Sequence, residues 1–534
     1  MKYIIDIDEE YTYLNEVGRK AYNLHLLKKN NIPIPKTLVL SKSCAEYYLN
    51  FNNIKNPIEQ KEKILTGVFP PEISHALENA LKINLSNQKL VCRSSSLNED
   101  SEFTSFAGQF TSIIGICSFE QLIQAVKICW YNNYNQNISE YSNYFGVPEA
   151  LYLPLIIQSM VLSRSAGVAF FDAINNKLII ESNWGLGMSV VDGSTTPDKF
   201  IIYKDEISIQ IKKKAIAFFS YEGIKNRNTG DVVFVKINDV DYSCNLIHVD
   251  AFDETALFQL GNELKEKASI EVDEAKAIND LACKIYDLFN VGIDIEWTFD
   301  FSGRLLILQA RPITATINFD EGNVEVPTFS IIGVPSSPGQ YIGNAKVIKD
   351  TTDFNKVMKG DILVCRSTNS SFMNVMKLAG GIITEEGGIL SHTAIVSREM
   401  GIPCITEVKD ALNRIKDLDL IMVNGTKGVI SYDINEFNTD KAVQLKETIY
   451  KYEEITFHAF LLFYNFKKER NLTNKDISYE EFEDYILKIS NIGREKKVLI
   501  CDKIPIKKFR YLVEKIKNSE KIKKYFIFRE GVEN

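Results

Sequence analysis

The feature that most constrains the fold is a glycine-marked turn between a short apolar run and a helix, within residues 378–405, LAGGIITEEGGILSHTAIVSREMGIPCI. The apolar pair at 382–383 predicts a buried strand, and the Glu-Glu-Gly-Gly segment at 385–388 predicts a turn. Ser391 stands where a helix N-cap belongs, and a glycine followed by a proline ends the helix about ten residues later. His392 is therefore expected on the first helical residue, with its ring facing a glycine-lined turn.

A histidine at the start of a helix suits phosphoryl chemistry. The first turn of a helix presents unpaired N–H groups and the positive end of the helix dipole, which attract phosphate. An imidazole placed there can take a phosphoryl group while the backbone binds the phosphate oxygens. Glycines in the turn let a bulky phosphate donor approach the backbone. On periodicity alone, the alternative for His392 is a structural capping or surface histidine.

The run 387–403, GGILSHTAIVSREMGIP, resembles the signature of the swivelling phosphohistidine domain of the dikinase-type phosphotransferases. That family includes phosphoenolpyruvate synthase, pyruvate phosphate dikinase and rifampicin phosphotransferase. The resemblance implies that His392, which follows a serine, carries the transferred phosphoryl group.

Length, net charge, cysteine spacing and apolar runs narrow the classes of function that this chain can have. A length of 534 residues predicts about three domains, and a net charge of −8 argues against a general affinity for nucleic acid. The nine cysteines form no CxxC pair, which favours free thiols in a reducing cytoplasm. The N-terminus has no long apolar stretch with basic flanks, and the longest apolar run, around 151–162, is too short to span a bilayer. We therefore expect a cytoplasmic protein without membrane attachment. No P-loop occurs, so any nucleotide must be held in another way.

Two N-terminal stretches carry candidate phosphate ligands. Lys20 lies in a predicted helix that ends at Asn30, and by itself it reads as an ordinary surface lysine. The stretch resembles the family's VGGKGANL opening, whose lysine meets the nucleotide phosphates, although Arg19 replaces a glycine. Arg93 precedes a serine cluster and the small-residue loop that contains Gly108, which otherwise reads as a flexible turn. The resemblance to the family's RSSATxED…SFAGQ pair implies that the arginine binds ATP and the loop covers its phosphates.

The next two stretches are candidates for the base and the ribose. Residues 151–170 predict two strands separated by a polar turn and resemble the family's VVVQxMV…AGV pattern. By that resemblance Gln158 and Met160 line the adenine slot, where a backbone hinge can read the base. Residues 181–200 resemble the family's WGLGExVVxGxxTPD pattern. Glu181 is expected either to reach the ribose or to be a plain solvated residue.

Residues 293–312, IDIEWTFDFSGRLLILQARP, predict a two-stranded hairpin. A two-residue turn at 302–303 would pair Glu296 with Gln309 and Asp294 with Arg311, all on one side of the ribbon. Carboxylate and amide oxygens can hold Mg²⁺, and the arginine supplies positive charge to phosphates. A surface hairpin with salt bridges is the alternative. The family pattern DIEW…LQARPIT implies that the acidic residue and the glutamine bind magnesium and the arginine binds phosphate.

The predicted fold class is α/β (α+β). An ATP-grasp nucleotide-binding domain of two lobes is expected at 1–314, with helical patterns over 254–290, followed by a linker at 315–330. A β/α phosphohistidine domain is expected at 331–436. The C-terminal segment 437–534, a small α/β segment with a basic end, has no assigned role beyond acceptor or partner binding.

The resemblance covers about residues 1–433. About a hundred residues remain, which is too few for the pyruvate-binding barrel of phosphoenolpyruvate synthase, and only a linker stands where rifampicin phosphotransferase has its drug-binding domain. The expected function is transfer of the β-phosphoryl group of ATP through His392 to an unidentified small-molecule or protein acceptor, with release of AMP and phosphate and with Mg²⁺ as cofactor. The sequence does not indicate an oligomeric state.

Three alternatives stay open. The chain can be a short or split phosphoenolpyruvate synthase-like subunit that uses a partner chain. It can be an ATP-grasp ligase that activates a carboxylate, with a vestigial histidine domain. It can also be a non-catalytic, nucleotide-binding regulator.

Overall fold

The computed structural model divides into two compact units, Met1–Asp433 and Ile434–Asn534. The residues that the structure describes are 2–9, 13–97, 99, 110–135, 138–139, 142, 151–172, 175–204, 206–220, 228–249, 254–313 and 330–432, with the backbone of 497–500 and 526–529. Among these residues, no helix combines the length and apolar character needed to cross a membrane.

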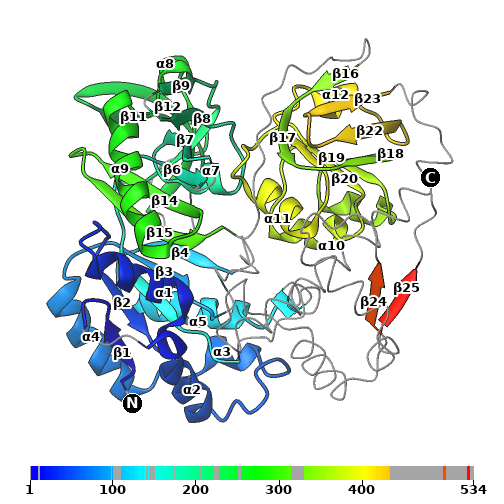
Figure 1. Cartoon of the computed structure of the whole chain (residues 1–534). Helices are drawn as coiled ribbons and strands as arrows, with labels where there is room; N and C mark the ends of the chain where they lie inside the picture. The colour runs from blue at the N-terminus through cyan, green and yellow to red at the C-terminus, as the bar shows by residue number, and fades with distance from the viewer. Residues whose placement is uncertain are drawn as a thin grey trace, which may run out of the picture. The chain divides into compact units, whose positions relative to one another are not determined.

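The N-terminal lobe of the first unit is a five-stranded sheet with the strand order β1-β2-β5-β3-β4, covered by helices on one face (Figure 1). Alternate residues of β2 and β5 point to that face, so Leu38 and Ile157 pack against the helices while Val39 and Ile156 face the opposite way. The elements are β1 (Ile4–Asp6), β2 (Thr37–Leu40), β3 (Leu90–Ser94), β4 (Ser112–Ile116), β5 (Leu155–Ser159), α2 (Lys42–Phe51), α3 (Glu62–Thr66), α4 (Pro71–Asn84) and α5 (Phe119–Asn132).

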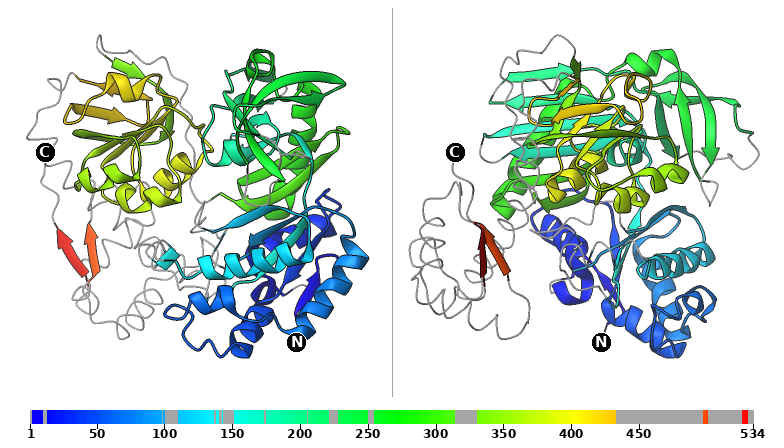
Figure 2. Two further views of the ribbon diagram at one scale, coloured as in Figure 1. Left: turned by 180° about the vertical axis from the view of Figure 1, so that it is seen from behind. Right: turned by 90° about the vertical axis from the view of Figure 1, so that its right-hand side faces the viewer.

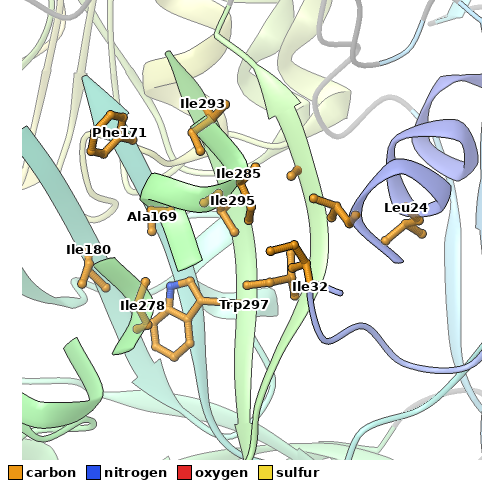
Figure 3. Packing of buried hydrophobic residues seen from close by; sticks show 14 of the residues in the cluster. Leu24, Ile32, Ala169, Phe171, Ile180, Ile278, Ile285, Ile293, Ile295 and Trp297 are labelled. Carbon is orange, nitrogen blue, oxygen red and sulfur yellow. The ribbon is translucent and has the colours of Figure 1, made fainter. Parts of the chain in front are cut away.

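The second lobe is built on a six-stranded antiparallel sheet with the order β15-β14-β6-β7-β8-β9. Helix α9 covers one face of this sheet, and α1 packs beside β15, so that Leu24 and Ile32 join the same apolar core as Trp297 and Ile278 (Figure 3). Trp297 is fully buried there. The elements are α1 (Leu14–Lys29), β6 (Ser163–Asp172), β7 (Lys177–Trp184), α7 (Met188–Val191), β8 (Asp198–Tyr203), β9 (Glu206–Gln210), α9 (Val272–Phe289), β14 (Ile293–Asp300) and β15 (Leu305–Pro312).

A smaller antiparallel sheet, with the order β10-β13-β12-β11, extends this lobe. Its core contains Trp184, whose indole N–H donates to the carbonyl of Leu264 at 3.0 Å. The elements are β10 (Ile216–Ser220), β11 (Val232–Ile237), β12 (Val240–Val249), β13 (Thr255–Leu260) and α8 (Asn262–Glu266).

The third part of the first unit, coloured from yellow-green to yellow-orange in Figure 2, is built on an eight-stranded sheet. The strand order is β16-β23-β22-β18-β19-β20-β21-β17, and β18 to β21 run parallel. Leu363 and Ile382 face the core on the side of α10 and α11, and their neighbours Ile362 and Ile383 face the core that contains Ala411 of α12. The elements are β16 (Ser330–Ile332), β17 (Val334–Ser337), β18 (Gln340–Ile348), η2 (Thr351–Lys356), β19 (Ile362–Cys365), η3 (Ser370–Phe372), α10 (Met373–Met376), β20 (Gly381–Thr384), α11 (His392–Met400), β21 (Cys404–Thr406), α12 (Ala411–Arg414), β22 (Leu420–Asn424) and β23 (Val429–Ser431).

In the second unit the structure describes a parallel pair of strands, β24 (Lys497–Ile500) and β25 (Phe526–Arg529). The predicted linker at 315–330 lies outside the described residues, apart from Ser330 at the start of β16.

The α/β fold with two lobes and a separate β/α part is confirmed, and so is the predicted strand–turn–helix around His392. Strand β20 ends at Thr384, Ser391 is the N-cap of α11, and Gly401 ends the helix in the left-handed conformation. The helical prediction for 254–290 is wrong at its beginning, where Thr255–Leu260 form β13. Apolar and polar side chains alternate weakly in that segment, and pairing with β10 and β12 decides its conformation.

Candidate functional site: a cluster of cations and carboxylates and a buried histidine

Helix α1 is interrupted so that its lysine lies beside the loop after β3. Gly18 has φ +76° inside the helix, and a Cβ added there would overlap the carbonyl oxygen of Ser95. The backbone N–H of Arg19 donates to Ser96 O at 3.2 Å just after this kink. Only glycine allows this approach, which brings Lys20 next to the serine cluster.

Lys20 forms an ion pair with Glu99, a carboxylate that the sequence analysis did not assign. Glu99 is almost fully buried, and it accepts hydrogen bonds from Ser94 Oγ at 3.0 Å and from the backbone N–H of Ser96 at 3.2 Å. The serine loop is therefore ordered around this carboxylate, and Glu99 offsets the charge of the lysine. The glutamate of the family pattern RSSATxED falls on Glu99, so this pattern could have pointed to it.

The predicted pairing in the hairpin is confirmed, because Glu296 lies opposite Gln309 and Asp294 lies opposite Arg311. The predicted two-residue turn is wrong. Asp300 N donates to Arg304 O and Gly303 N donates to Asp300 O, which closes a three-residue loop. Its left-handed residue is Gly303, with φ +80°.

A β-bulge corrects the register that this longer loop would otherwise shift. The pairing changes between Glu296 and Trp297, which leaves Leu308 as the extra residue of β15. The carbonyl of Leu308 accepts a hydrogen bond from Arg93 Nη1 at 3.4 Å. The bulge therefore sets the Glu296–Gln309 pair and provides a further oxygen for the arginine.

Arg93 crosses from the N-terminal lobe to the hairpin of the second lobe. Its Nη2 donates to Glu296 Oε2 at 2.9 Å and to Gln309 Oε1 at 2.7 Å. In the same hairpin, Arg311 donates through Nε and Nη2 to Asp294 Oδ2, at 2.8 and 2.7 Å. Arginines from both lobes thus lie in one cluster with these carboxylates.

The electrostatics of Glu296 show how many cations meet there. Burial opposes ionisation of this carboxyl group, but the charges of Arg93, Lys20 and Arg311 outweigh burial and hold the pKa of Glu296 below its ordinary value. Glu296 is therefore ionised at neutral pH. An anionic ligand with several phosphates would be attracted by the same three cations.

The oxygens of Glu296 and Gln309 fit the expected magnesium ion in their chemistry. Both oxygens point at one cationic atom, Arg93 Nη2, and carboxylate and amide oxygens are the donors that Mg²⁺ prefers. Among the described residues, no group of three or more His, Cys, Asp or Glu side chains is arranged to hold a metal. Any ion at this hairpin would therefore take further ligands from substrate or water.

The residues expected to line the adenine slot lie at the end of β5, shortly before the chain enters β6 of the second lobe. Gln158 on β5 is buried, and its Nε2 donates to Thr37 Oγ1 at 2.9 Å. Met160 is buried just after β5, and its backbone N–H donates to Lys89 O at 2.8 Å. That N–H is already used within the fold, so a backbone contact with a base would have to come from the residues that follow. The predicted phosphate loop with Gly108 lies outside the described residues.

His392 is buried at the first position of α11, at the ends of the parallel strands β19 and β20. Its Nδ1 lies 3.2 Å from Thr368 Oγ1, which in turn lies 2.8 Å from Thr393 Oγ1. Its Nε2 is buried and has no hydrogen-bond partner among the residues that the structure describes. Burial lowers the pKa of His392 to about 4, so the ring is neutral at physiological pH.

Of the two expected roles of Glu181, the structure contradicts one. The side chain is fully buried, so the solvated role is wrong. Its Oε1 accepts from the backbone N–H of Ile389 at 2.9 Å, and its Oε2 accepts from that of Leu390 at 3.2 Å. Both oxygens thus contact the segment before His392, and the contact with a ribose stays a prediction.

The comparisons with known proteins agree with this architecture. Residues 14–327 match the family described as pyruvate phosphate dikinase, AMP/ATP-binding domain, and residues 357–428 match the family described as PEP-utilising enzyme, mobile domain.

Curated relatives include three phosphoenolpyruvate synthases. The one from Aeropyrum pernix is 30% identical over 465 residues, which cover 78% of this chain and 56% of the relative. The one from Pyrococcus furiosus is 34% identical over 379 residues, covering 68% and 44%, and the one from Escherichia coli is 29% identical over 396 residues, covering 70% and 47%. The chain thus spans about half the length of the curated relatives it matches.

A family match over more than half of the chain, together with the site that its own residues build, leads to one conclusion. The chain belongs to the pyruvate phosphate dikinase and phosphoenolpyruvate synthase family of dikinase-type phosphotransferases.

Proposed function

We propose that this protein transfers the β-phosphoryl group of ATP to His392 and from there to an acceptor, with release of AMP and phosphate. The observation that carries the proposal is the state of His392. Its ring is neutral and buried at a helix N-terminus, and its Nε2 has no hydrogen-bond partner among the described residues. A neutral imidazole with an uncommitted nitrogen is a nucleophile.

The proposed step forms one bond and breaks one bond at the β-phosphorus. The lone pair of His392 Nε2 attacks the β-phosphorus of ATP, the N–P bond forms, and the bond from phosphorus to the α,β-bridging oxygen breaks, so that AMP leaves. Water then attacks the γ-phosphorus and releases phosphate, which leaves phosphohistidine. If the ring carries its proton on Nδ1, Thr368 Oγ1 is the acceptor that favours this tautomer.

The cluster around the hairpin supports the same substrate. Lys20, Arg93 and Arg311 are the cations that would exchange carboxylate partners for phosphate oxygens when ATP binds. Glu296 and Gln309 would hold Mg²⁺, which when bound offsets the charge of the phosphates. By resemblance, Gln158 and Met160 line the adenine slot, and the loop with Gly108 covers the phosphates.

The test is labelling with ATP that carries the label on the β-phosphate. Wild-type protein should acquire label that is stable to base and labile to acid, with AMP as the nucleotide product, and His392→Ala should acquire none. ADP as product, with full ATP consumption by His392→Ala, would instead indicate a carboxylate-activating ligase. Tight ATP binding with neither labelling nor consumption would indicate a regulator.

A second candidate is favoured by the relatives, which are phosphoenolpyruvate synthases. In this reading the chain is a short subunit that passes its phosphoryl group to pyruvate with the help of a partner chain. Labelled His392 protein should then form labelled phosphoenolpyruvate when pyruvate and the partner are added. Label that remains on the protein under those conditions would exclude pyruvate as the acceptor.

A further inference from the structure

Glu181 joins the nucleotide-binding lobe to the histidine-bearing part of the first unit. It lies on β7, and its two oxygens accept from consecutive backbone N–H groups, those of Ile389 and Leu390. These residues immediately precede Ser391, the N-cap of α11. A single buried carboxylate therefore binds the backbone two and three residues before the proposed nucleophile.

The fit around this contact leaves no room for a side chain. A Cβ added at Gly388 would overlap the Glu181 carboxylate, and the three atoms nearest to that Cβ all belong to Glu181. On the other side of the loop, a Cβ at Gly193 would lie 3.0 Å from Ser391 Cβ and 3.4 Å from Gly387 Cα. Gly388 does not have a positive φ, so its lack of a side chain is explained by the close approach and not by its backbone conformation.

Apolar and charged contacts surround the same loop. Ile389 and Leu390 pack in one cluster with residues of the second lobe, namely Val168, Phe170, Ile179 and Val190. Lys212, which follows β9, donates to Glu407 after β21 at 2.7 Å. Lys199 Nζ lies 3.8 Å from Glu181 and 3.9 Å from Glu407, so the two carboxylates share a cation.

We propose that Glu181 is a positioning residue that docks the loop Gly388–Ser391 onto the nucleotide-binding lobe and thereby holds His392 for loading. The assignment rests on the proposed function for its role in the reaction, but the docking contact itself does not. The hydrogen bonds of Glu181 go to the backbone N–H groups of Ile389 and Leu390 and not to the imidazole, so its effect on His392 would pass through the backbone it binds.

The carboxylate suits this role because it accepts two hydrogen bonds at two oxygens. A glutamine of the same shape has one oxygen and one NH₂ group. Its NH₂ group would face one of the two backbone N–H groups, so two donors would meet and one hydrogen bond would be lost. Glu181→Gln should therefore undock the loop while preserving the size of the side chain. Gly388→Ala changes the loop instead of the carboxylate and should also undock it, because the added methyl group overlaps Glu181 only when the loop is docked.

The first experiment measures docking directly, by amide hydrogen exchange of the full chain without nucleotide. The amides of Ile389 and Leu390 should be protected in wild type and should exchange faster in Glu181→Gln and in Gly388→Ala. Peptides from β14 and β19 should keep wild-type exchange in both variants, which reports intact domains. Glu206→Gln, the same exchange of groups at an exposed position of β9, is the matched control and should behave as wild type.

The second experiment separates positioning from nucleotide binding. In single-turnover labelling of His392, Glu181→Gln should lower the rate by about tenfold to a hundredfold, the size expected when hydrogen bonds to a buried charged group are lost. The Kd for ATP should stay within about twofold, since the hydrogen bonds and ion pair of Glu181 go to Ile389, Leu390 and Lys199 and not to the cations proposed to bind the phosphates.

The two kinds of failure are distinguishable. If no protein, wild type included, becomes labelled, the proposed function fails while hydrogen exchange still decides docking. If the amides of Ile389 and Leu390 stay protected in both undocking variants, or if the labelling rate of Glu181→Gln equals that of wild type, the positioning role of Glu181 is overturned.

Discussion

Arg93 and Glu296, which lie 203 positions apart in the sequence, form an ion pair with an N–O distance of 2.9 Å between the two nucleotide-binding lobes. The guanidinium reaches two further oxygens at once, Gln309 Oε1 and the carbonyl of Leu308. One planar side chain therefore links the strand β3 of one lobe to a β-bulge of the other. The contact is one that a phosphate can take over when ATP arrives, because guanidinium binds carboxylate and phosphate in the same fork.

Replacing Arg93 with lysine should weaken ATP binding while keeping the charge. Lysine presents one point of charge and cannot reach three oxygens in a plane, so we expect a loss of about 1.5–3 kcal/mol, which is about ten- to a hundredfold in Kd. Isothermal titration with ATP measures this change. Arg304→Lys, at the exposed turn of the same hairpin, is the matched control and should bind as wild type. Equal affinities for Arg93→Lys and wild type would exclude a bidentate role for Arg93.

The ion pair between Lys20 and the buried Glu99 allows effects on stability to be separated from effects on ATP binding. Lys20→Met should leave Glu99 buried without its cation and lower the free energy of unfolding by about 3 kcal/mol. Adding Glu99→Gln to that variant should restore most of the stability, because the uncompensated charge is gone. Thermal melting of the two variants measures this recovery, and ATP titration should show weak binding in both. Recovery of ATP binding in the double variant would contradict a phosphate-binding role for Lys20.

Gly18 should be intolerant of any side chain. Gly18→Ala places a residue at φ +76° and a methyl group onto the carbonyl of Ser95, so both strain and overlap destabilise the fold. Gly230→Ala is an informative control, since Gly230 has φ +90° but nothing within 4 Å of its added Cβ. That control should lose only about 1–2 kcal/mol from the left-handed conformation. We expect Gly18→Ala to melt at a clearly lower temperature than Gly230→Ala, and equal melting temperatures would refute the packing argument.

The pH dependence of loading should follow the buried state of His392. Burial lowers the pKa of His392 from 6.5 to about 4, so the folded protein binds fewer protons than the unfolded chain between these values. The buried neutral ring therefore imposes no titration cost on stability above pH 6.5, and the folded protein loses stability as the pH falls from 6.5 towards 4. Single-turnover labelling between pH 8 and pH 5.5 should show no step centred at 6.5. A half-maximal loss near pH 6.5 would mean that the ring titrates as an exposed histidine.

The sequence by itself determined the local chemistry of the two strongest segments. The helix that starts at His392 follows a glycine-marked turn and ends at a glycine in the left-handed conformation, and both signals act within a few residues. Ser391 holds the N-cap position, although its hydroxyl donates to the carbonyl of Gly388 and not to the helix. The pairing of Glu296 with Gln309 was predicted correctly although the predicted turn was wrong. The longer loop at Gly303 and the bulge at Leu308 shift the register by one residue each and in opposite directions. The pattern of side chains on one face of the ribbon was therefore kept even though the turn was not.

Only the tertiary structure decided which distant groups meet. No local pattern distinguishes a solvated glutamate from Glu181, whose burial depends on the loop before His392, more than 200 residues later in the chain. The ion pair between Lys20 and Glu99 and the bridge from Arg93 to the hairpin likewise arise only when separate strands and helices pack together. Hydrogen bonds and charges act over a few ångströms in space, whereas periodicity reports only neighbours along the chain, so these contacts could not be predicted from the sequence.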